Sequence, residues 1–427
     1  MMWRYLYTLL FHLLLPAVIV RLWWRGGSER GYRQNIGERF GLAGGNEAKQ
    51  DVIWIHAVSV GEVRAALPLI GKLRKTFADR PMVLTCMTPT GRRTARSLLP
   101  DDVDVRYLPY DLPWAHALFI TRHQPAMLIV METELWPNAL AACRHRQVPT
   151  FLVNARMSEK SQRGYLKYLP GRALAREALR GFTAVMAQSA DDAARLTTLG
   201  ATEVMVVGNV KFDVIPDDAA IALGKSWRAQ SPNRKVILLA STRDQEELPL
   251  VKAFLHISTW PGATRPLLVV VPRHPSRCDL VQQQIQHTGL SVRRRSAGID
   301  ATSLAKTDVL LGDSMGEMQA FYALCDVAII GGSFQALGGQ NLIEATALGK
   351  PVIMGPSTFN FSEAVTLARA ADAMQSVADA DGAMEAARVL LGDAGRLAAM
   401  GANARAFAGA HGGATARTVA LIQANIN

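Results

Sequence analysis

The sequence predicts an α/β fold in which two Rossmann-like domains enclose a cleft, preceded by an N-terminal membrane-anchor helix. Three observations lead to this prediction. Short apolar runs alternate with helical stretches along most of the chain, which is the pattern of parallel βαβ units. At 427 residues the chain is longer than one hydrophobic core usually organises. Its first 25 residues form a separate apolar segment.

The composition is that of a folded and strongly basic protein. Hydrophobic residues make up 49% of the chain and charged residues 19%, and the formal net charge is +11. These values exclude a disordered chain, and the charge suits nucleic acid, an anionic membrane or a phosphorylated substrate as partner. Four of the eight tryptophans precede residue 55, and the aromatic residues do not alternate with Arg and Lys in any RNA-binding signature. We therefore expect no nucleic acid partner.

The four cysteines predict neither a disulfide nor a metal site. Cys86, Cys143, Cys278 and Cys325 are far apart in the sequence and form no CxxC pair. Such spacing is typical of reduced thiols in a cytosolic protein. We expect no zinc, no other metal and no cofactor.

Residues 1–25 have the features of a membrane anchor. The run Tyr5–Val20 is apolar apart from Thr8 and His12, and arginine and tryptophan residues flank it. No small-residue cleavage site follows, as a signal peptide would require, so we expect the segment to be retained. The arginines after the run favour a cytoplasmic location for the next domain.

Three interpretations of this segment remain open. Its length is near the lower limit of about 17 residues for a spanning helix, and Pro16 allows a kink. A spanning helix and a shallow interfacial helix therefore both fit. The third interpretation is a buried helix of the first domain.

The strand pattern divides the rest of the chain into two domains. We expect a first domain with a possible acceptor site at residues 26–212 and a second domain with a nucleotide-like site at residues 213–427, with the crossover within residues 212–234, which contain two prolines and no long apolar run. Strands are expected at 52–56, 82–88, within 105–113, and at 126–134, 150–158, 183–189, 203–209, 235–242, 267–275, 290–296, 308–314, 327–330 and 351–356, with Ala-rich helical sequence to the end.

The stretch 325–354 predicts a nucleotide site in the second domain. An apolar run ends in two glycines, a second glycine pair follows, and a helical pattern opens at Asn341. Glycines let the backbone approach a ligand closely, and a helix start offers N–H groups to a phosphate. Glu344 has two carboxylate oxygens for a ribose diol. The alternative is that these glycine turns only connect βα units.

Charged residues follow several strands at the ends where ligands bind in such sheets. Glu62 follows the first strand and Glu132 the fourth apolar run, and each is either a general base or a helix cap. Lys211 and Arg273 have the charge to neutralise a departing phosphate. The segment 315–317 is expected to open a helix whose N–H groups do the same.

A series of short motifs occurs along the chain in the order found in a known protein family. The motifs are SVGE (59–62), MTPTG (87–91), LPYDLP (108–113), METELWPN (131–138), NARMS (154–158), VKFD (210–213), VPRHP (271–275), GDSMGE (312–317) and GGSF with GGQN (331–341). Together they resemble the 3-deoxy-D-manno-octulosonic acid (Kdo) transferases of lipid A biosynthesis, over nearly the whole chain. The resemblance implies a GT-B fold and an inverting transferase that moves Kdo from CMP-Kdo to a lipid A precursor (lipid IVA). It also implies attachment to inner-membrane lipids at the cytoplasmic face.

The resemblance also assigns roles by position. It implies that Glu62 is the general base and that Glu132 and Lys211 stabilise the transition state. Two motifs depart from the family pattern: Gln340 and Leu342 stand where a His and a Pro are frequent, and STRDQEE replaces STHEGEE, which leaves the contact of Arg243 open. The implied CMP-binding residues are Arg273, His274, Met315, Gly316, Glu317, Asn341, Leu342, Ile343 and Glu344.

Two other functions fit the residues less fully. A UDP-dependent GT-B sugar transferase or a nucleotide-sugar epimerase would share the fold, although an epimerase would not need the anchor. A membrane-attached nucleotide-binding scaffold would keep the glycine loop but would not need Glu62.

Overall fold

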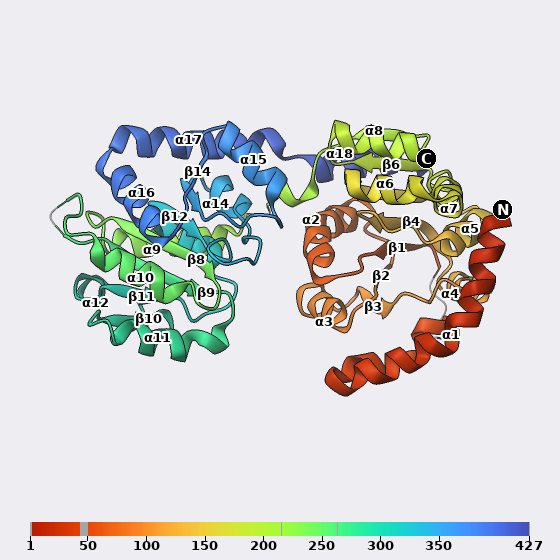
Figure 1. The fold of residues 1–427 in the computed structure, drawn as a ribbon, viewed down its shortest axis with the longest axis horizontal. Helices are drawn as coiled ribbons and strands as arrows, with labels where there is room; N and C mark the ends of the chain where they lie inside the picture. Colours follow the sequence, from red (N-terminus) through yellow and green to blue (C-terminus); the bar gives the residue numbers. More distant parts are fainter. Residues whose placement is uncertain (1, 43–49, 215, 263, 427) are drawn as a thin grey trace. The chain divides into compact units, whose positions relative to one another are not determined.

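The computed structural model describes residues 2–42, 50–214, 216–262 and 264–426. The chain forms two compact units (Figure 1). Unit 1 comprises Met1–Asp213 together with Gly412–Asn427, and unit 2 comprises Val214–His411. Each unit is built on a parallel sheet of seven strands, as the alternating pattern predicts.

The sheet of unit 1 has the strand order β3-β2-β1-β4-β5-β6-β7. β1 therefore lies between β2 and β4, and the chain changes direction across the sheet at the β1–β4 pair. In open α/β sheets such a switch point is where ligands bind, beyond the carboxyl ends of the strands. The strands are β1 (Val52–His56), β2 (Met82–Cys86), β3 (Asp104–Tyr107), β4 (Pro125–Met131), β5 (Thr150–Ala155), β6 (Ala184–Ala187) and β7 (Val204–Val206).

Helices cover both faces of this sheet (Figure 1). Side chains alternate along a strand, so Ile53 and Ile55 belong to one core cluster while Val52 and Trp54 belong to the other. All five residues of β1 are buried, as expected for a central parallel strand. The helices are α2 (Val60–Thr76), α3 (Pro89–Leu98), α4 (Pro113–His123), α5 (Pro137–His145), α6 (Glu159–Lys167), α7 (Leu169–Leu179) and α8 (Ala190–Leu199).

Unit 2 repeats this architecture with the strand order β10-β11-β9-β8-β12-β13-β14. Here β8 and β12 form the central pair, and β12 is followed by the glycine loop of the predicted nucleotide site. The strands are β8 (Val236–Thr242), β9 (Leu267–Pro272), β10 (Val292–Arg294), β11 (Val309–Leu311), β12 (Val327–Ile330), β13 (Val352–Met354) and β14 (Met374–Ser376). The helices are α9 (Asp218–Ala229), α10 (Glu247–His256), α11 (Cys278–Gln286), α12 (Ala301–Ala305), α13 (Met318–Leu324), α14 (Ile343–Ala347), α15 (Ser362–Ala370), α16 (Ala380–Gly392) and α17 (Ala394–His411).

The C-terminus differs from the expected domain limits. Helix α18 (Ala414–Ile426) packs on α2 of unit 1, where Val419 and Ile422 join the same core cluster as Ile53. Asp213 fixes the return of the chain, because its carboxylate accepts hydrogen bonds from the N–H groups of Gly413 and Thr415. Residues 412–427 therefore do not belong to the expected second domain at 213–427.

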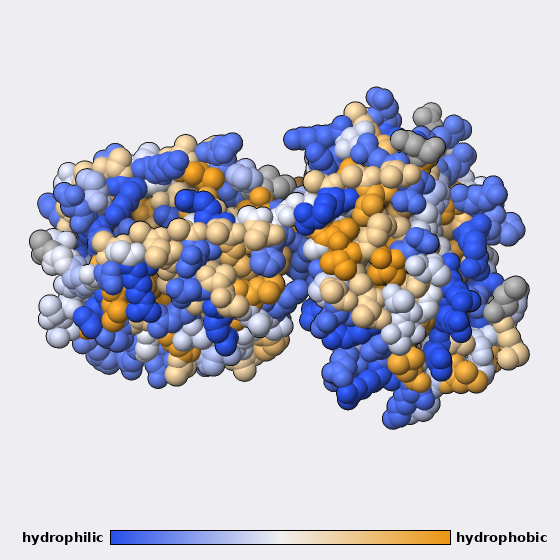
Figure 2. All heavy atoms as spheres, turned by 90° about the horizontal axis from the view of Figure 1, so that it is seen from above, coloured by the Kyte–Doolittle hydropathy of each residue, from blue (hydrophilic) through white to orange (hydrophobic). Residues whose placement is uncertain are grey.

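Helix α1 (Met2–Ser28) is long and apolar enough to cross a membrane. Only 6% of its most apolar 18-residue window is buried, so it is not the buried core helix that we considered. Eleven of the 24 exposed large hydrophobic side chains in the described residues belong to α1. On the face drawn in Figure 2, hydrophobic side chains form patches among hydrophilic ones.

Several contacts hold α1 against unit 1. Arg4 Nε lies 3.0 Å from Glu177 Oε1, and Thr8 Oγ1 lies 3.1 Å from Asn138 Oδ1. Further along α1, Phe11, Leu15 and Val18 pack on a small cluster that contains Tyr110, Leu112 and Ala115. One face of the helix is therefore docked, while the apolar remainder faces outward.

Candidate active site

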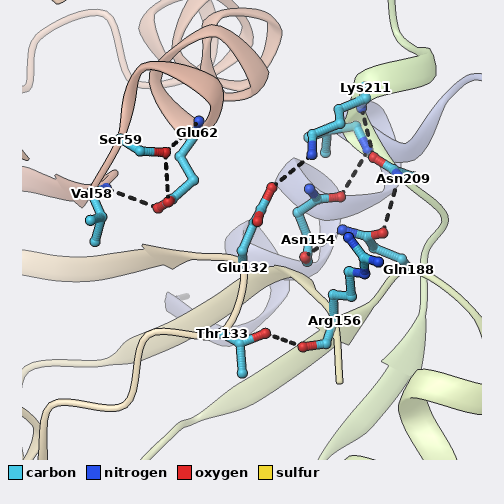
Figure 3. Close-up of polar contacts among 11 residues, drawn as sticks. Val58, Ser59, Glu62, Glu132, Thr133, Asn154, Arg156, Gln188, Asn209 and Lys211 are labelled. Carbon is cyan, nitrogen blue, oxygen red and sulfur yellow. Dashed lines mark hydrogen bonds and ion pairs between the residues drawn. The ribbon is translucent and has the colours of Figure 1, made fainter. Parts of the chain in front are cut away.

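Glu62 lies in the first turn of α2, directly beyond β1. Its N–H points to Ser59 Oγ, the cap of the helix, at 3.5 Å. Its carboxylate accepts two hydrogen bonds, from the Val58 N–H at 2.8 Å and from the Ser59 hydroxyl at 3.0 Å. The side chain therefore has the cap role that we considered, and these two bonds also fix the orientation of the carboxylate (Figure 3).

Burial raises the pKa of Glu62 above its ordinary value. The Val58 N–H opposes this shift, and the neighbouring carboxylate of Glu132 adds to it. A carboxylate with a raised pKa is a stronger proton acceptor once it is ionised. The environment of Glu62 thus suits a general base.

Glu132 and Lys211 form an ion pair at the same end of the sheet (Figure 3). Lys211 Nζ lies 2.9 Å from Glu132 Oε1, and both side chains are partly exposed. Glu132 directly follows β4 and has a positive φ of 57°, whereas Lys211 lies in the short helix η3 (Val210–Phe212) after β7. Two segments that are almost 80 residues apart in sequence thus bring opposite charges together.

Three amide side chains hold η3 in place, and our sequence analysis gave them no role of this kind. Asn154 Oδ1 accepts from the Val210 N–H at 3.1 Å, and Asn209 Oδ1 accepts from the Lys211 N–H at 3.0 Å. Gln188 accepts from the Asn209 amide at 3.0 Å and donates to the Asn154 carbonyl at 2.9 Å. Their position was the available signal, since Asn154 lies at the carboxyl end of β5 and Gln188 and Asn209 follow β6 and β7, where polar residues must satisfy the backbone of the following loop.

Glu134 is a third carboxylate of this region, after Glu62 and Glu132, and the family resemblance gave it no role. Burial, together with the charges of Glu62 and Glu132, raises its pKa to about 7. It lines a small cavity with His56 and Trp136. Burial lowers the pKa of His56 to about 4, so this ring is neutral at pH 7.

Backbone N–H groups of the glycine loop of unit 2, residues 331–339, form hydrogen bonds within the protein. The N–H groups of Gly332 and Phe334 donate to the carboxylate of Glu246 at 2.7 and 2.9 Å. Those of Gly338 and Gly339 donate to Ser357 Oγ and to the Gly332 carbonyl. These N–H groups are therefore satisfied within the protein and are not offered to a ligand.

Glu246 is the buried residue that organises this loop. It is only 1% exposed and accepts three backbone hydrogen bonds, the third from the Arg243 N–H at 2.8 Å. The glycine at 331 is required by packing, because a Cβ there would lie 2.5 Å from the Cα of Thr242. The STRDQEE segment thus supports the loop through its first Glu, and Arg243 takes part through its main chain.

The predicted helix at Asn341 begins later, at Ile343. The side chain of Asn341 accepts from the Ile343 N–H at 2.9 Å and donates to Glu344 Oε1 at 3.1 Å. The side chains of Leu342 and Ile343 are buried in the core. Glu344 is the one acidic side chain at this helix start.

The remaining predicted donor residues lie beyond β9 and β11. His274 is largely exposed. The small part of the ring that is shielded from water and the charges of the neighbouring arginines lower its pKa. Met315 is 75% exposed. Gly316 has a φ of 80°, and the expected helix opens after Glu317, at Met318. Glu317 is engaged by Arg295 at 2.9 Å and by the Ser314 hydroxyl.

Arg273 follows β9 directly, and its N–H donates to the Thr242 carbonyl on the neighbouring β8. The structure therefore brings Arg273, His274 and the glycine loop to the same end of the sheet in unit 2, and Glu62, Glu132 and Lys211 to the corresponding end in unit 1. In the part of the chain that the structure describes, no group of three or more His, Cys, Asp or Glu side chains is arranged to hold a metal ion.

Comparison with known proteins shows the family to which the chain is related. A family model described as 3-deoxy-D-manno-octulosonic-acid transferase (kdotransferase) matches residues 34–214. The 3-deoxy-D-manno-octulosonic acid transferase of Bordetella pertussis is 43% identical, covering 99% of each chain. The transferase of that name from Haemophilus influenzae is 34% identical over 85% of this chain and 84% of its own.

Solved structures support the fold. A UDP-GlcNAc 2-epimerase from Neisseria meningitidis aligns with a TM-score of 0.56 at 16% identity, covering 88% of this chain and 100% of its own. A glycosyltransferase from Rickettsia africae aligns with a TM-score of 0.53 at 14% identity, covering 88% and 98%. At these identities the likeness concerns the two-Rossmann GT-B architecture alone. The full-length relatives establish more: the chain belongs to the 3-deoxy-D-manno-octulosonic acid transferase family, and it is a glycosyltransferase that transfers Kdo.

Proposed function

We propose that the protein is an inverting glycosyltransferase that moves Kdo from CMP-Kdo to a hydroxyl of a lipid A precursor such as lipid IVA. The observation that carries this proposal is the orientation of Glu62. Two hydrogen bonds hold its carboxylate beyond β1 at the switch point of the unit 1 sheet, and its pKa is raised. A general base for an incoming hydroxyl needs such a position and such a pKa.

In the proposed reaction the acceptor oxygen attacks the anomeric carbon of Kdo. The carbon–oxygen bond to the phosphate of CMP breaks as the new bond forms, and CMP leaves with the bonding electrons. Glu62 takes the proton of the acceptor hydroxyl. The Lys211 ammonium, held by Glu132, stabilises the negative charge that develops in the transition state.

We assign donor binding to unit 2. The cationic and glycine-containing segments beyond β9, β11 and β12 supply Arg273, His274, residues 315–317 and residues 341–344. Glu344 remains the proposed partner of the ribose hydroxyls, because a carboxylate presents two acceptor oxygens to a diol. Arg273 is proposed to bind the phosphate of CMP.

We assign membrane attachment, at the cytoplasmic face of the inner membrane, to α1. Its outward apolar side chains support this role. The contacts of Arg4 and Thr8 with unit 1 favour a helix that lies in the interface, since a spanning helix would have to leave these partners.

The test is a transfer assay with purified full-length protein in detergent. The protein is incubated with CMP-Kdo and a tetra-acylated lipid A precursor, and the lipid product is analysed by mass spectrometry. We expect a mass increase of one or more Kdo units, CMP as the second product, and the same rate in the presence of EDTA. No mass increase with CMP-Kdo, but transfer from a UDP-sugar, would refute the donor assignment.

A further inference from the structure

A basic groove lies on unit 1 between α1, α5 and α7, with a volume of about 430 Å³. Its polar lining consists mainly of four exposed arginines, and its apolar lining consists of Trp3, Leu169 and Ala173. The arginines are Arg144, Arg172, Arg176 and Arg180.

The arginines of this groove carry uncompensated charge. Arg172, Arg176 and Arg180 follow one another at intervals of four, which places like charges side by side on one helix face. Across the described residues, none of the four guanidinium groups has a salt bridge or a side-chain hydrogen bond. The one carboxylate in the groove, Glu177, is engaged by Arg4 at 3.0 Å. Such a cluster suits an anionic ligand with several oxygen acceptors, above all a phosphate.

Exposed apolar residues lie close in sequence to the residues that line this groove. Leu169 is 65% exposed and Tyr168 62%, and on α1 Met2 and Tyr5 are 72% and 62% exposed. Phosphate-binding charge next to apolar surface matches a lipid, whose phosphate is joined to acyl chains, better than it matches a free anion.

The groove lies toward the opposite end of the sheet from the catalytic residues. Arg144 is in the last turn of α5, which leads into β5, and Arg180 follows α7, which leads into β6. These are the amino ends of the strands, whereas Glu62 and Glu132 follow carboxyl ends. The groove is therefore unsuited to holding the reacting end of the acceptor.

We propose that this arginine groove binds the phosphate of an anionic membrane phospholipid, whose acyl chains run along the exposed face of α1. The inference rests on the proposed membrane attachment of α1 and adds a specific headgroup site to it. The phosphodiester accepts hydrogen bonds from the arginines, and the bilayer covers Trp3, Leu169 and the outward side of α1.

Vesicle binding of the full-length protein tests this site. The probes are vesicles of phosphatidylcholine alone and vesicles with 20% phosphatidylglycerol. In Arg144→Gln/Arg172→Gln we expect affinity for the anionic vesicles to fall about 25-fold, or about fivefold for each charge, which is ~1 kcal/mol each. Binding to phosphatidylcholine vesicles, which depends on α1, should stay at the wild-type level.

The matched control is Arg369→Gln/Arg396→Gln, which removes two exposed charges from unit 2. It should change anionic-vesicle affinity by less than twofold. An equal loss in this control would overturn the proposal, because it would show that net charge alone drives binding. Loss of binding to phosphatidylcholine vesicles in the groove variant would also overturn it.

Two further measurements distinguish a membrane phospholipid from free phosphate and from the lipid acceptor as the ligand of the groove. If 10 mM inorganic phosphate displaces the protein from anionic vesicles at constant ionic strength, the groove is a free-anion site and the proposal fails. If Arg144→Gln/Arg172→Gln raises KM for the lipid acceptor in detergent, the groove binds the substrate and the proposal fails. Unchanged turnover in detergent combined with weak anionic-vesicle binding supports it, and this assay reports the transferase activity independently.

Discussion

Lys211 Nζ lies 2.9 Å from Glu132 Oε1, and the backbone of Glu132 is in the left-handed region, with a φ of 57°. A non-glycine residue in the left-handed region costs of order 1–3 kcal/mol. The ion pair itself is partly exposed and contributes only about 0–1 kcal/mol to stability. The pair therefore does not offset the strain of its own backbone, which favours a role in function.

We predict that Lys211→Met lowers kcat by about 10² to 10³, because it removes a positive charge placed for the transition state. The melting temperature should change by less than about 3 °C, since the pair adds little stability. Glu132→Gln and the double variant complete a double-mutant cycle. If the pair acts as a unit, the double variant is no slower than Lys211→Met. Fully additive losses would show that the two residues act independently.

Glu62→Gln should lower turnover by about 10² to 10⁴ while the melting temperature stays near that of the wild type. The amide keeps the size of the side chain and one acceptor oxygen, but it cannot take the proton. Binding of CMP by unit 2 should be unchanged, and calorimetric titration with CMP checks this.

Unit 1 contains a matched control for the capping role. Ser189 caps α8 as Ser59 caps α2, and Asp192 three residues later accepts from its hydroxyl at 2.6 Å and from the Met157 N–H at 2.7 Å. Asp192→Asn therefore makes the same chemical change at the cap of a different helix. It should retain turnover. Comparable losses of turnover in both variants would assign Glu62 to capping alone.

The raised pKa of Glu134 predicts a pH-dependent effect on stability. Its pKa is about 7 in the folded protein and 4.5 ordinarily, so between these values the folded state binds more protons than the unfolded state. Stability contributed by the neutral carboxyl is therefore present below pH 4.5 and is lost as pH rises through 7. Glu134→Gln, which stays neutral, should melt roughly 2–4 °C higher than the wild type at pH 8 and show no gain at pH 4.5. Scanning calorimetry at both pH values measures this, and an equal shift at both would contradict it.

Much of the fold follows directly from the sequence. The runs at 52–56 and 327–330 are β1 and β12 without change, because central parallel strands are continuous apolar runs bounded by turn residues. Edge strand β14 (Met374–Ser376) is absent from the predicted strands, since three residues with one buried side chain carry no period. The return of α18 to unit 1 also escaped prediction, because its apolar face does not specify which sheet it covers.

The candidate site, too, could be predicted from the sequence only in part. Position after a strand placed Glu62, Glu132 and Lys211 among the candidate residues, since parallel strands bring their carboxyl ends together, and the family resemblance then gave these three their roles. The pairing of Glu132 with Lys211 was not predictable, because it depends on the strand order between β4 and β7. The internal contacts of the glycine loop were not predictable for a physical reason: glycines permit a close approach, but the sequence does not tell whether a ligand or the protein itself makes it.

The last prediction concerns Glu246. Its carboxylate accepts from the N–H groups of Arg243, Gly332 and Phe334, and Glu246→Gln replaces one acceptor oxygen with a donor. At least one buried N–H then loses its partner, which costs about 1–3 kcal/mol. We expect a lower melting temperature and at least a tenfold loss of CMP affinity by calorimetric titration, because the loop beyond β12 shifts. Glu247→Gln is the control, since Glu247 is equally buried but bonds Arg277 and Thr242 instead of the loop. It should lose stability to a similar degree but retain more of its CMP affinity, and a Glu246→Gln protein with wild-type CMP affinity would show that the loop geometry does not matter for the donor.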